Sequence, residues 1–189
     1  MRLQLVAALL AFGVITVAAK AESVTYTVTD TASGTLGAQS FTNQNITVTF
    51  TGDTANITGG SGFYTNRPGT STINIAGLGT FTFSGSPYFF DNQGAAAAGI
   101  GETSGSILDT YNSAFAGYTG STSLGPVSGE VFYRSDLNFG TSGGALNIAS
   151  AGPNSTFTAT VGATPEPSSF ALLGSGLLGM LGFARRRLA

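Results

Sequence analysis

Hydrophobic and polar side chains alternate along several short stretches of the chain. Val24, Tyr26 and Val28 occupy every second position of the first stretch, and threonines fill the positions between them. Alternation with this period is typical of a β-strand that buries one of its faces. We therefore predict strands at residues 24–29, 45–51, 72–76, 79–84, 130–139, 145–149 and 155–162.

Glycine-rich segments such as residues 58–62 and 140–144 separate these predicted strands. Helical periodicity is absent between them, and residues 95–98 are too few for more than one helical turn. We expect residues 91–105 and the Gly125-Pro126 pair to form surface loops. Many short strands joined by such turns predict an all-β fold, an antiparallel β-sandwich with a jelly-roll-like arrangement.

The predicted strands all lie in residues 22–164, a segment of the usual size for one domain. This segment contains 23 glycines and 11 phenylalanines. Disordered segments usually lack aromatic residues and carry a high net charge, whereas only 8% of the residues of this chain are charged. We expect residues 22–164 to fold as a single domain.

The N-terminus has the three parts of a secretory signal peptide. Arg2 provides the positive charge, and an apolar run extends from Leu3 to Ala19. Ala19, Lys20 and Ala21 then form a small-x-small sequence of the kind that signal peptidase cleaves. We predict a signal helix in residues 1–21 that is removed after Ala21, which places the following domain outside the cytoplasm.

The C-terminus reads as a membrane anchor preceded by a short motif. Pro165, Glu166 and Pro167 come first, and residues 168–184 carry no charge. As a helix, these seventeen residues would extend about 26 Å, slightly less than the hydrocarbon core of a bilayer. Three arginines follow, Arg185, Arg186 and Arg187. The positive-inside rule predicts that they hold the end of a transmembrane helix in the cytoplasm.

The order of Pro-Glu-Pro, a Gly/Leu-rich helix and an arginine cluster resembles the PEP-CTERM sorting tail, over residues 165–189. The resemblance implies a bacterial envelope of the Gram-negative type and a membrane exosortase that recognises Pro-Glu-Pro. It further implies an association with exopolysaccharide. The protein would be anchored transiently in the inner membrane, with its domain in the periplasm, and would then reach the cell surface or the extracellular matrix. The same tail is also known as an ice-binding protein C-terminal region, a name that does not describe the preceding domain.

Composition removes most catalytic chemistry from consideration. The chain has no Cys and no His, which excludes thiolate metal sites and the Ser-His and Cys-His nucleophile systems. Residues 22–164 contain eight acids against two arginines, a net charge of −6 that opposes binding to nucleic acid. A glycosidase needs two carboxylates about 5–9.5 Å apart, and the scattered acids show no such pair. We therefore expect no enzyme activity.

The remaining oxygen ligands could bind calcium, which takes carboxylate, amide and backbone oxygens from loops. No cofactor is expected, because these residues follow no EF-hand or other fixed pattern. The first candidate ligands for Ca²⁺ are Asp53, Asp91, Asn92, Asp109, Asp136 and Asn138.

Threonine rows and tyrosines offer two kinds of binding surface. Threonines repeat at every second position in residues 25–29, 47–51, 80–82 and 156–160, on the side opposite the apolar residues. A flat, straight threonine face would favour ice binding, although threonine is also common on exposed strands. A curved face with exposed aromatic rings would favour sugar binding. The candidate tyrosines are Tyr64, Tyr88, Tyr111, Tyr118 and Tyr133.

Together these features predict a secreted, exosortase-sorted protein of the cell surface or exopolysaccharide matrix, with a structural or glycan-binding role and no catalysis. Two alternatives remain open from the sequence. One is an ice- or ligand-binding β module carried by the same tail. The other is a polysaccharide hydrolase, which a cleft with two close carboxylates would reveal.

Overall fold

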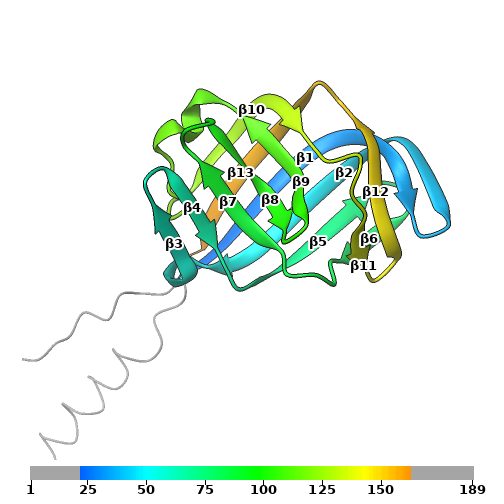
Figure 1. Ribbon diagram of the computed structural model, residues 1–189, viewed down its shortest axis with the longest axis horizontal. Helices are drawn as coiled ribbons and strands as arrows, with labels where there is room; N and C mark the ends of the chain where they lie inside the picture. Colours follow the sequence, from blue (N-terminus) through cyan, green and yellow to red (C-terminus); the bar gives the residue numbers. More distant parts are fainter. Residues whose placement is uncertain (1–21, 163–189) are drawn as a thin grey trace, which may run out of the picture.

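A computed structural model describes residues 22–162 of the chain, in which thirteen strands and two short 3₁₀ helices follow one another (Figure 1). The strands are β1 (Ser23–Leu36), β2 (Gln39–Asp53), β3 (Ile57–Gly60), β4 (Phe63–Asn66), β5 (Gly69–Ile75), β6 (Gly79–Thr82), β7 (Tyr88–Asn92), β8 (Ala97–Glu102), β9 (Gly105–Tyr111), β10 (Leu124–Phe132), β11 (Phe139–Thr141), β12 (Gly144–Ala151) and β13 (Asn154–Gly162). The 3₁₀ helices are η1 (Thr54–Asn56) and η2 (Ser113–Gly117). The predicted signal helix and transmembrane helix lie outside the described residues. Within residues 22–162, no helix is long and apolar enough to span a membrane.

All thirteen strands belong to one antiparallel sheet. Its main path runs β3-β4-β7-β8-β9-β10-β13-β1-β2-β5-β6, and β12 and β11 branch from β1. The all-β antiparallel prediction is therefore confirmed. The difference from the predicted jelly-roll sandwich is that the two layers are parts of a single curled sheet instead of two separate sheets.

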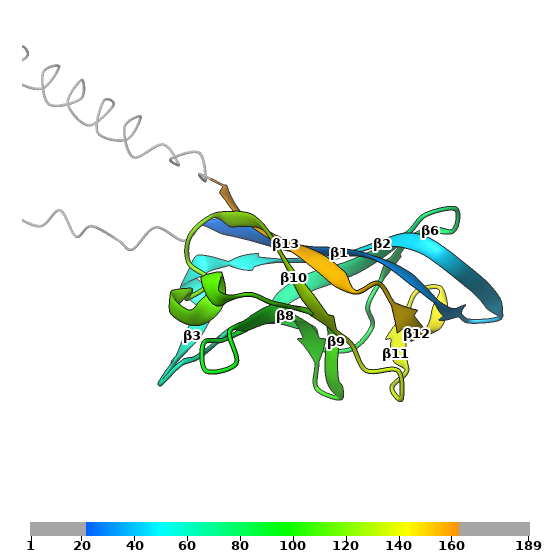
Figure 2. The same cartoon turned by 90° about the horizontal axis from the view of Figure 1, so that it is seen from above.

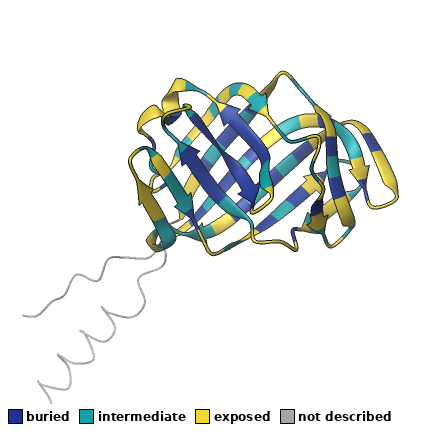
Figure 3. Cartoon of the chain, in the orientation of Figure 1, coloured by how far each residue is buried: buried dark blue, intermediate teal, exposed yellow. Residues whose placement is uncertain are grey.

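The sheet curls so that β7, β8 and β9 lie over β13, β1 and β2, which Figure 2 shows edge on. The inner faces of the two layers meet in the hydrophobic core. Tyr26 of β1 and Phe89 of β7 stack there with their ring centroids 3.7 Å apart, and Phe157 of β13 packs 6.0 Å from Phe89. Figure 3 shows the buried residues concentrated where the layers overlap. The outer faces of the two layers consequently point in opposite directions.

The alternating sequence explains β1, β2 and β13. Val24, Tyr26 and Val28 are fully buried, whereas the threonines between them point away from the core. β1 pairs with β2 on one side along almost its whole length. On its other side it pairs with β13 as far as Thr29 and with β12 from Ala32 onward. This change of partner opens the sheet beside Asp30.

At the end of the molecule away from the described termini, the sheet closes on itself. The segment after β6 meets β11, where Ser84 N–H donates to the Gly140 carbonyl (2.9 Å) and Ser142 N–H to the Thr82 carbonyl (2.8 Å). β12 then joins β11 to β1. Phe83 and Phe139 are buried inside this ring of strands. No edge of the sheet is left open along these segments.

The expectation that residues 91–105 form a surface loop is wrong. This segment contains the end of β7 and all of β8, and every residue of Ala97–Glu102 is buried. Alanine and glycine dominate β8, so it lacks the large side chains at every second position that reveal a strand. Gly125 and Pro126 also lie within a strand, β10, at an irregularity in its pairing with β13.

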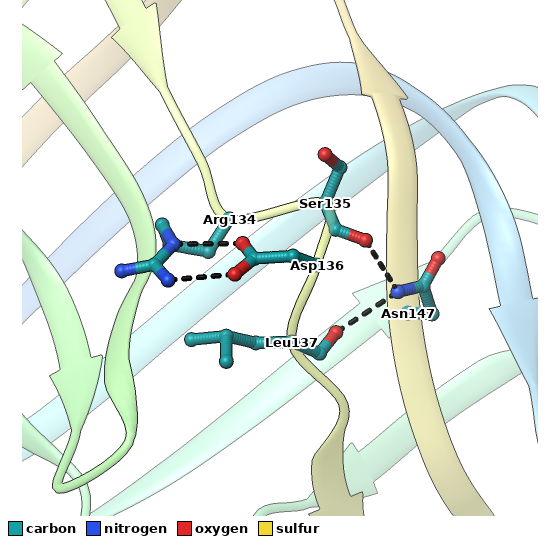
Figure 4. Close-up of polar contacts among 5 residues, drawn as sticks. All are labelled: Arg134, Ser135, Asp136, Leu137 and Asn147. Carbon is teal, nitrogen blue, oxygen red and sulfur yellow. Dashed lines mark hydrogen bonds and ion pairs between the residues drawn. The ribbon is translucent and has the colours of Figure 1, made fainter.

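The strand predicted at residues 130–139 is interrupted. β10 ends at Phe132, β11 begins at Phe139, and the residues between them form a loop (Figure 4). Arg134 binds Asp136 through two hydrogen bonds of 2.8 and 2.7 Å. Asn147 of β12 donates to the carbonyls of Ser135 and Leu137 at 3.0 and 2.9 Å. These side-chain contacts replace the backbone pairing that a continuous strand would need.

Candidate functional site

Exposed aromatic rings gather on one outer face of the curled sheet. Among the described residues, the large apolar side chains with high exposure are Phe63 (45%), Tyr111 (37%) and Phe132 (42%). They belong to β4, β9 and β10, and they lie on the side of the sheet opposite the core residue Phe89. Three exposed rings on the same outer face make this surface a candidate binding site.

Two groups of rings flank β8 on this surface. In the first, the Phe90 ring, which is only 9% exposed, lies 6.2 Å from Phe63 and 6.1 Å from Tyr88, measured between ring centroids. The Arg67 guanidinium stacks 3.6 Å above the Tyr88 ring. In the second group, Tyr111 and Phe132 meet edge to face at 6.4 Å. We call the surface formed by Phe63, Tyr88, Phe90, Tyr111 and Phe132 the aromatic face.

Small residues of β8 fill the strip between the two groups of rings. Ala97 and Gly99 lie opposite Tyr111 and Asp109 in the register with β9. A Cβ atom at Gly99 would collide with Asp109 Oδ1 and would approach the Leu108 carbonyl oxygen to 2.6 Å. Gly99 is therefore needed for the Asp109 side chain to lie across β8.

Two acids accompany Tyr111 on the aromatic face. Asp109 is only 3% exposed, its Oδ1 accepts a hydrogen bond from the Ser106 hydroxyl, and burial raises its pKa to about 8. Glu130 of β10 lies directly opposite Tyr111. Burial, together with the negative charges of Asp109 and Glu130, raises the pKa of Tyr111. The Tyr111 side chain is consequently a neutral hydrogen-bond donor at physiological pH.

The opposite outer face carries threonines in register across five strands, and we call it the threonine face. One row contains Thr160, Thr25, Thr51 and Thr70, the next contains Thr158, Thr27, Thr49, Thr72 and Thr82, and the third contains Thr156, Thr29, Thr47, Asn74 and Thr80. Neighbouring strands are about 4.8 Å apart, and alternate residues along a strand about 6.7 Å. The face is thus a regular array of hydroxyl and methyl groups.

The threonine face is hollowed where β1 changes partner from β13 to β12. The threonine-face depression has a volume of about 470 Å³ and is lined by Thr29, Asp30, Thr31, Asn45, Ile46, Thr47, Asn154 and Thr156. The side chains of Thr31, Asn45, Thr47 and Asn154 make no hydrogen bond to any other described residue. Their polar groups are therefore available to a ligand.

Asp30 is the only charged residue in the lining of this depression. Its Oδ1 accepts a hydrogen bond from Thr31 N–H at 2.6 Å, while its Oδ2 is buried without a partner among the described residues. Burial raises the pKa of Asp30, against the opposing effect of the hydrogen bonds from the Thr31 and Gly152 N–H groups. The rest of the lining is neutral and, apart from Ile46, polar.

Another carboxyl group, that of Asp91, lies inside the molecule. Asp91 is fully buried on the inner face of β7, and neither of its oxygens has a hydrogen-bond partner in residues 22–162. Burial raises its pKa to about 7. Nearby, the Tyr26 hydroxyl donates to the Gly120 carbonyl (2.8 Å) and accepts from Asn66 Nδ2 (3.3 Å).

The structure separates the candidate calcium ligands. Asp53 and Asn92 accept hydrogen bonds from the Ala55 and Ala95 N–H groups, at 2.7 and 3.1 Å. Asp91 faces the core, Asp109 faces outward, and Asp136 is paired with Arg134. Within the described part of the chain, no three acidic side chains come close enough together to hold a metal ion.

The tyrosine candidates are only partly correct. Tyr111 lies on the aromatic face, as does the half-buried Tyr88, whereas Tyr118 is buried in the core and donates to the Thr122 carbonyl (2.8 Å). Tyr64 and Tyr133 are half-buried. Sequence reasoning missed Phe63, Phe90, Phe132 and Arg67. Only Phe132 had a local signal, because its spacing from Glu130 places both on one side of a strand.

The comparison with known families concerns the C-terminus. Residues 163–187 match the family described as PEP-CTERM protein-sorting motif. The chain carries a PEP-CTERM sorting motif. This motif contains the predicted processing residues Pro165, Glu166 and Pro167 and the arginines at 185–187, all outside the described residues, as are Ala19 and Ala21. The PEP-CTERM motif marks an exported protein with an exosortase as its processing partner. No curated protein and no solved structure matches the chain.

Proposed function

We propose that residues 22–162 of this PEP-CTERM protein are a non-catalytic glycan-binding domain of the cell surface or exopolysaccharide matrix. The proposal rests on one observation, the gathering of Phe63, Tyr111 and Phe132 on a single outer face. Pyranose rings have apolar C–H faces that pack against aromatic rings, and their hydroxyl groups bind nearby polar side chains. Tyr111, Glu130 and Arg67 offer such polar groups beside the rings.

Several features support a binding role over catalysis. Asp91 and Asp109 point to opposite sides of the sheet, so they cannot act on the same substrate. Asp109 and Glu130 do share the aromatic face, but neither lines the larger depression at Thr29 or the smaller one of about 300 Å³ at Ser40. A glycosidase holds its two carboxylates around the scissile bond of an enclosed sugar. The exposed aromatic face does not enclose a ligand in this way.

The binding test uses the full-length chain in a detergent without a sugar headgroup, against immobilised exopolysaccharide from the host and a panel of neutral polysaccharides. We expect the double variant Tyr111→Ala and Phe132→Ala to bind the best polysaccharide at least about tenfold more weakly, since two stacking rings are lost. The control Phe132→Tyr keeps its ring and should bind like the wild type. Unchanged binding by the double variant would refute the role of this face, and release of new reducing ends would indicate a hydrolase.

The proposed route places signal cleavage by signal peptidase first, periplasmic anchoring second and exosortase processing last. Intact-mass spectrometry of the protein recovered separately from membranes and from extracellular matrix tests this route. We expect a matrix form that begins at Glu22 and ends near residues 165–167, with or without added mass. A form found only in membranes and ending at Ala189 would contradict exosortase processing and leave a plain tail-anchored protein.

The registered threonine rows favour a second candidate function, binding to ice. Regular hydroxyl and methyl groups can order water when they lie on a flat surface, but this sheet is curled, which favours the glycan proposal. Thermal hysteresis and ice-crystal shape measure the alternative directly. If the threonine face binds ice, Thr49→Tyr at the centre of the array should abolish both effects, whereas Tyr111→Ala on the opposite face should leave them unchanged.

A further inference from the structure

We propose that the threonine-face depression is a second glycan site, so that each protein molecule bridges two polysaccharide chains. This inference rests on the proposed function of the aromatic face, because bridging requires both sites. The ligand class is a neutral, polyhydroxylated polymer. The two sites differ in chemistry, since one offers exposed rings and the other offers hydroxyl and amide groups.

The lining of the depression suits a neutral sugar. Asn45 and Asn154 each offer an amide donor and acceptor, and Thr31 and Thr47 each offer a hydroxyl, with no partner among the described residues. These groups come from β1, β2 and β13, so they converge from three adjacent strands on one hollow. Sugar hydroxyls donate and accept hydrogen bonds in the same way, so they can pair with all of these groups at once.

The size and charge of the depression agree with this ligand class. Its volume of about 470 Å³ falls within the range of about 300–1,000 Å³ that small-molecule sites occupy. Asp30 is the only charged side chain in the lining, and its Oδ2 is buried beneath the surface. No cation lines the depression to pair with an acidic polymer. A neutral chain therefore has the most complementary chemistry.

The curled sheet places the two sites back to back. Val28 of β1 and Phe89 of β7 are buried in the core between the layers, so Thr29 and Phe90, their neighbours along the strands, point outward on opposite sides. Two packed layers are about 10 Å apart, with side chains filling the space between them. A polysaccharide on the aromatic face cannot reach the depression through this core. Each face consequently takes a separate chain or a distant part of the same one.

Back-to-back sites predict cross-linking and not merely coating. A protein with two sites for one polymer gains apparent affinity because the second contact is intramolecular, by a factor of about 10² or more. It also joins two chains into a network. A protein with one site binds the polymer without joining it, and this difference separates the second site from the first.

The test mixes the full-length protein, in a detergent without a sugar headgroup, with the soluble neutral polysaccharide that binds best among dextran, galactomannan, xyloglucan and mixed-linkage β-glucan. Turbidity and viscosity report bridging, and binding to the immobilised polymer reports affinity. We expect the wild type to raise both turbidity and viscosity. The double variant Asn45→Ala and Asn154→Ala should lose the rise while it still binds through its aromatic face, with apparent affinity about 10²-fold or more below that of the wild type.

Matched variants define the outcome. Asn138→Ala, an exposed asparagine in the loop between β10 and β11, should bridge like the wild type. The variant Tyr111→Ala and Phe132→Ala should also lose bridging while it retains binding through the depression. Bridging that persists in the Asn45→Ala and Asn154→Ala variant would overturn the second site. Binding without any bridging by the wild type would overturn it as well, whereas no binding to any polysaccharide would overturn the proposed function itself.

Discussion

At the scale of the residue, the buried carboxyl group of Asp91 should make the stability of the protein depend on pH. This carboxyl group is buried without a partner among the described residues, and burial raises its pKa to about 7. In the unfolded chain an aspartate titrates near pH 4. Between these values the unfolded chain loses the proton that the folded protein keeps, so the free energy of unfolding falls by about 1.4 kcal/mol per pH unit. Asp109, whose pKa is raised to about 8, acts in the same direction.

We therefore expect the protein to be more stable near pH 5 than near pH 8. Asp91→Asn removes one of the buried ionisations and should reduce this difference substantially, while Asp109 and the other buried carboxyl groups maintain the rest. The variant should be more stable than the wild type at pH 8, where ionisation of the buried Asp91 destabilises the folded wild type. It should be no more stable below about pH 3, where the carboxyl group is protonated in both states. Urea unfolding midpoints at several pH values measure the effect.

Asp136→Asn is the control for this experiment. Asp136 is exposed, and its hydrogen bonds to Arg134 lower its pKa to about 2, so any stability it contributes is lost only in acid. The control should keep the pH dependence of the wild type between pH 5 and pH 8. A parallel curve for Asp91→Asn in this range would show that Asp91 is not protonated in the folded protein.

At the scale of the strand, the alternation of hydrophobic and polar residues was sufficient to predict a strand wherever large side chains face the core. β1, β2 and β13 were predictable because Val24, Tyr26 and Phe157 alternate with threonines. β8 was not predictable, because four of its six residues are alanine or glycine and no large hydrophobic side chains recur at every second position. The end of β10 was also beyond prediction, since the hydrogen bonds from Asn147 that hold the following loop, to the Ser135 and Leu137 carbonyls, depend on tertiary geometry.

The close packing around β8 leads to a prediction for Gly99. An added Cβ would lie 2.6 Å from the Leu108 carbonyl oxygen and 2.8 Å from Asp109 Cα, and these backbone atoms cannot move aside cheaply. Gly99→Ala should lower the free energy of unfolding by about 1–3 kcal/mol, the usual cost of overpacking. The added methyl group should also displace the Asp109 side chain, and this displacement should weaken glycan binding to the aromatic face. Urea unfolding and binding to the immobilised polysaccharide check the two effects.

Gly94→Ala provides the matched control. Gly94 is exposed in the turn before β8, and the nearest atom to an added Cβ is Asn92 Oδ1, at an ordinary 3.5 Å. This variant should change stability by no more than about 0.5 kcal/mol. Equal destabilisation by both substitutions would mean that the effect arises from glycine flexibility and not from contact with Asp109 and Leu108.

At the scale of the whole molecule, the sequence predicted threonine rows and aromatic rings as two kinds of binding surface. It did not predict where on the folded protein each surface lies. The threonine rows follow from alternation within each strand, yet their alignment across five strands depends on register. Phe63 and Phe132 are far apart in the sequence and share a face only because β4, β7, β8, β9 and β10 are neighbours in the sheet. The Pro-Glu-Pro sorting motif, by contrast, is a short continuous sequence and was recognisable without any structure.

The distribution of charge over the molecule predicts how salt affects binding. The eight acids and two arginines of residues 22–162 repel anionic polymers at long range, and both proposed glycan sites use mainly neutral groups. Screening by salt acts on charges and leaves ring stacking and neutral hydrogen bonds nearly unchanged. Binding of the best polysaccharide should therefore differ by less than about twofold between about 50 and 500 mM NaCl. A loss of tenfold or more at high salt would mean that the ligand is a cationic polymer held by the acids, and an equal gain would mean that it is an anionic one.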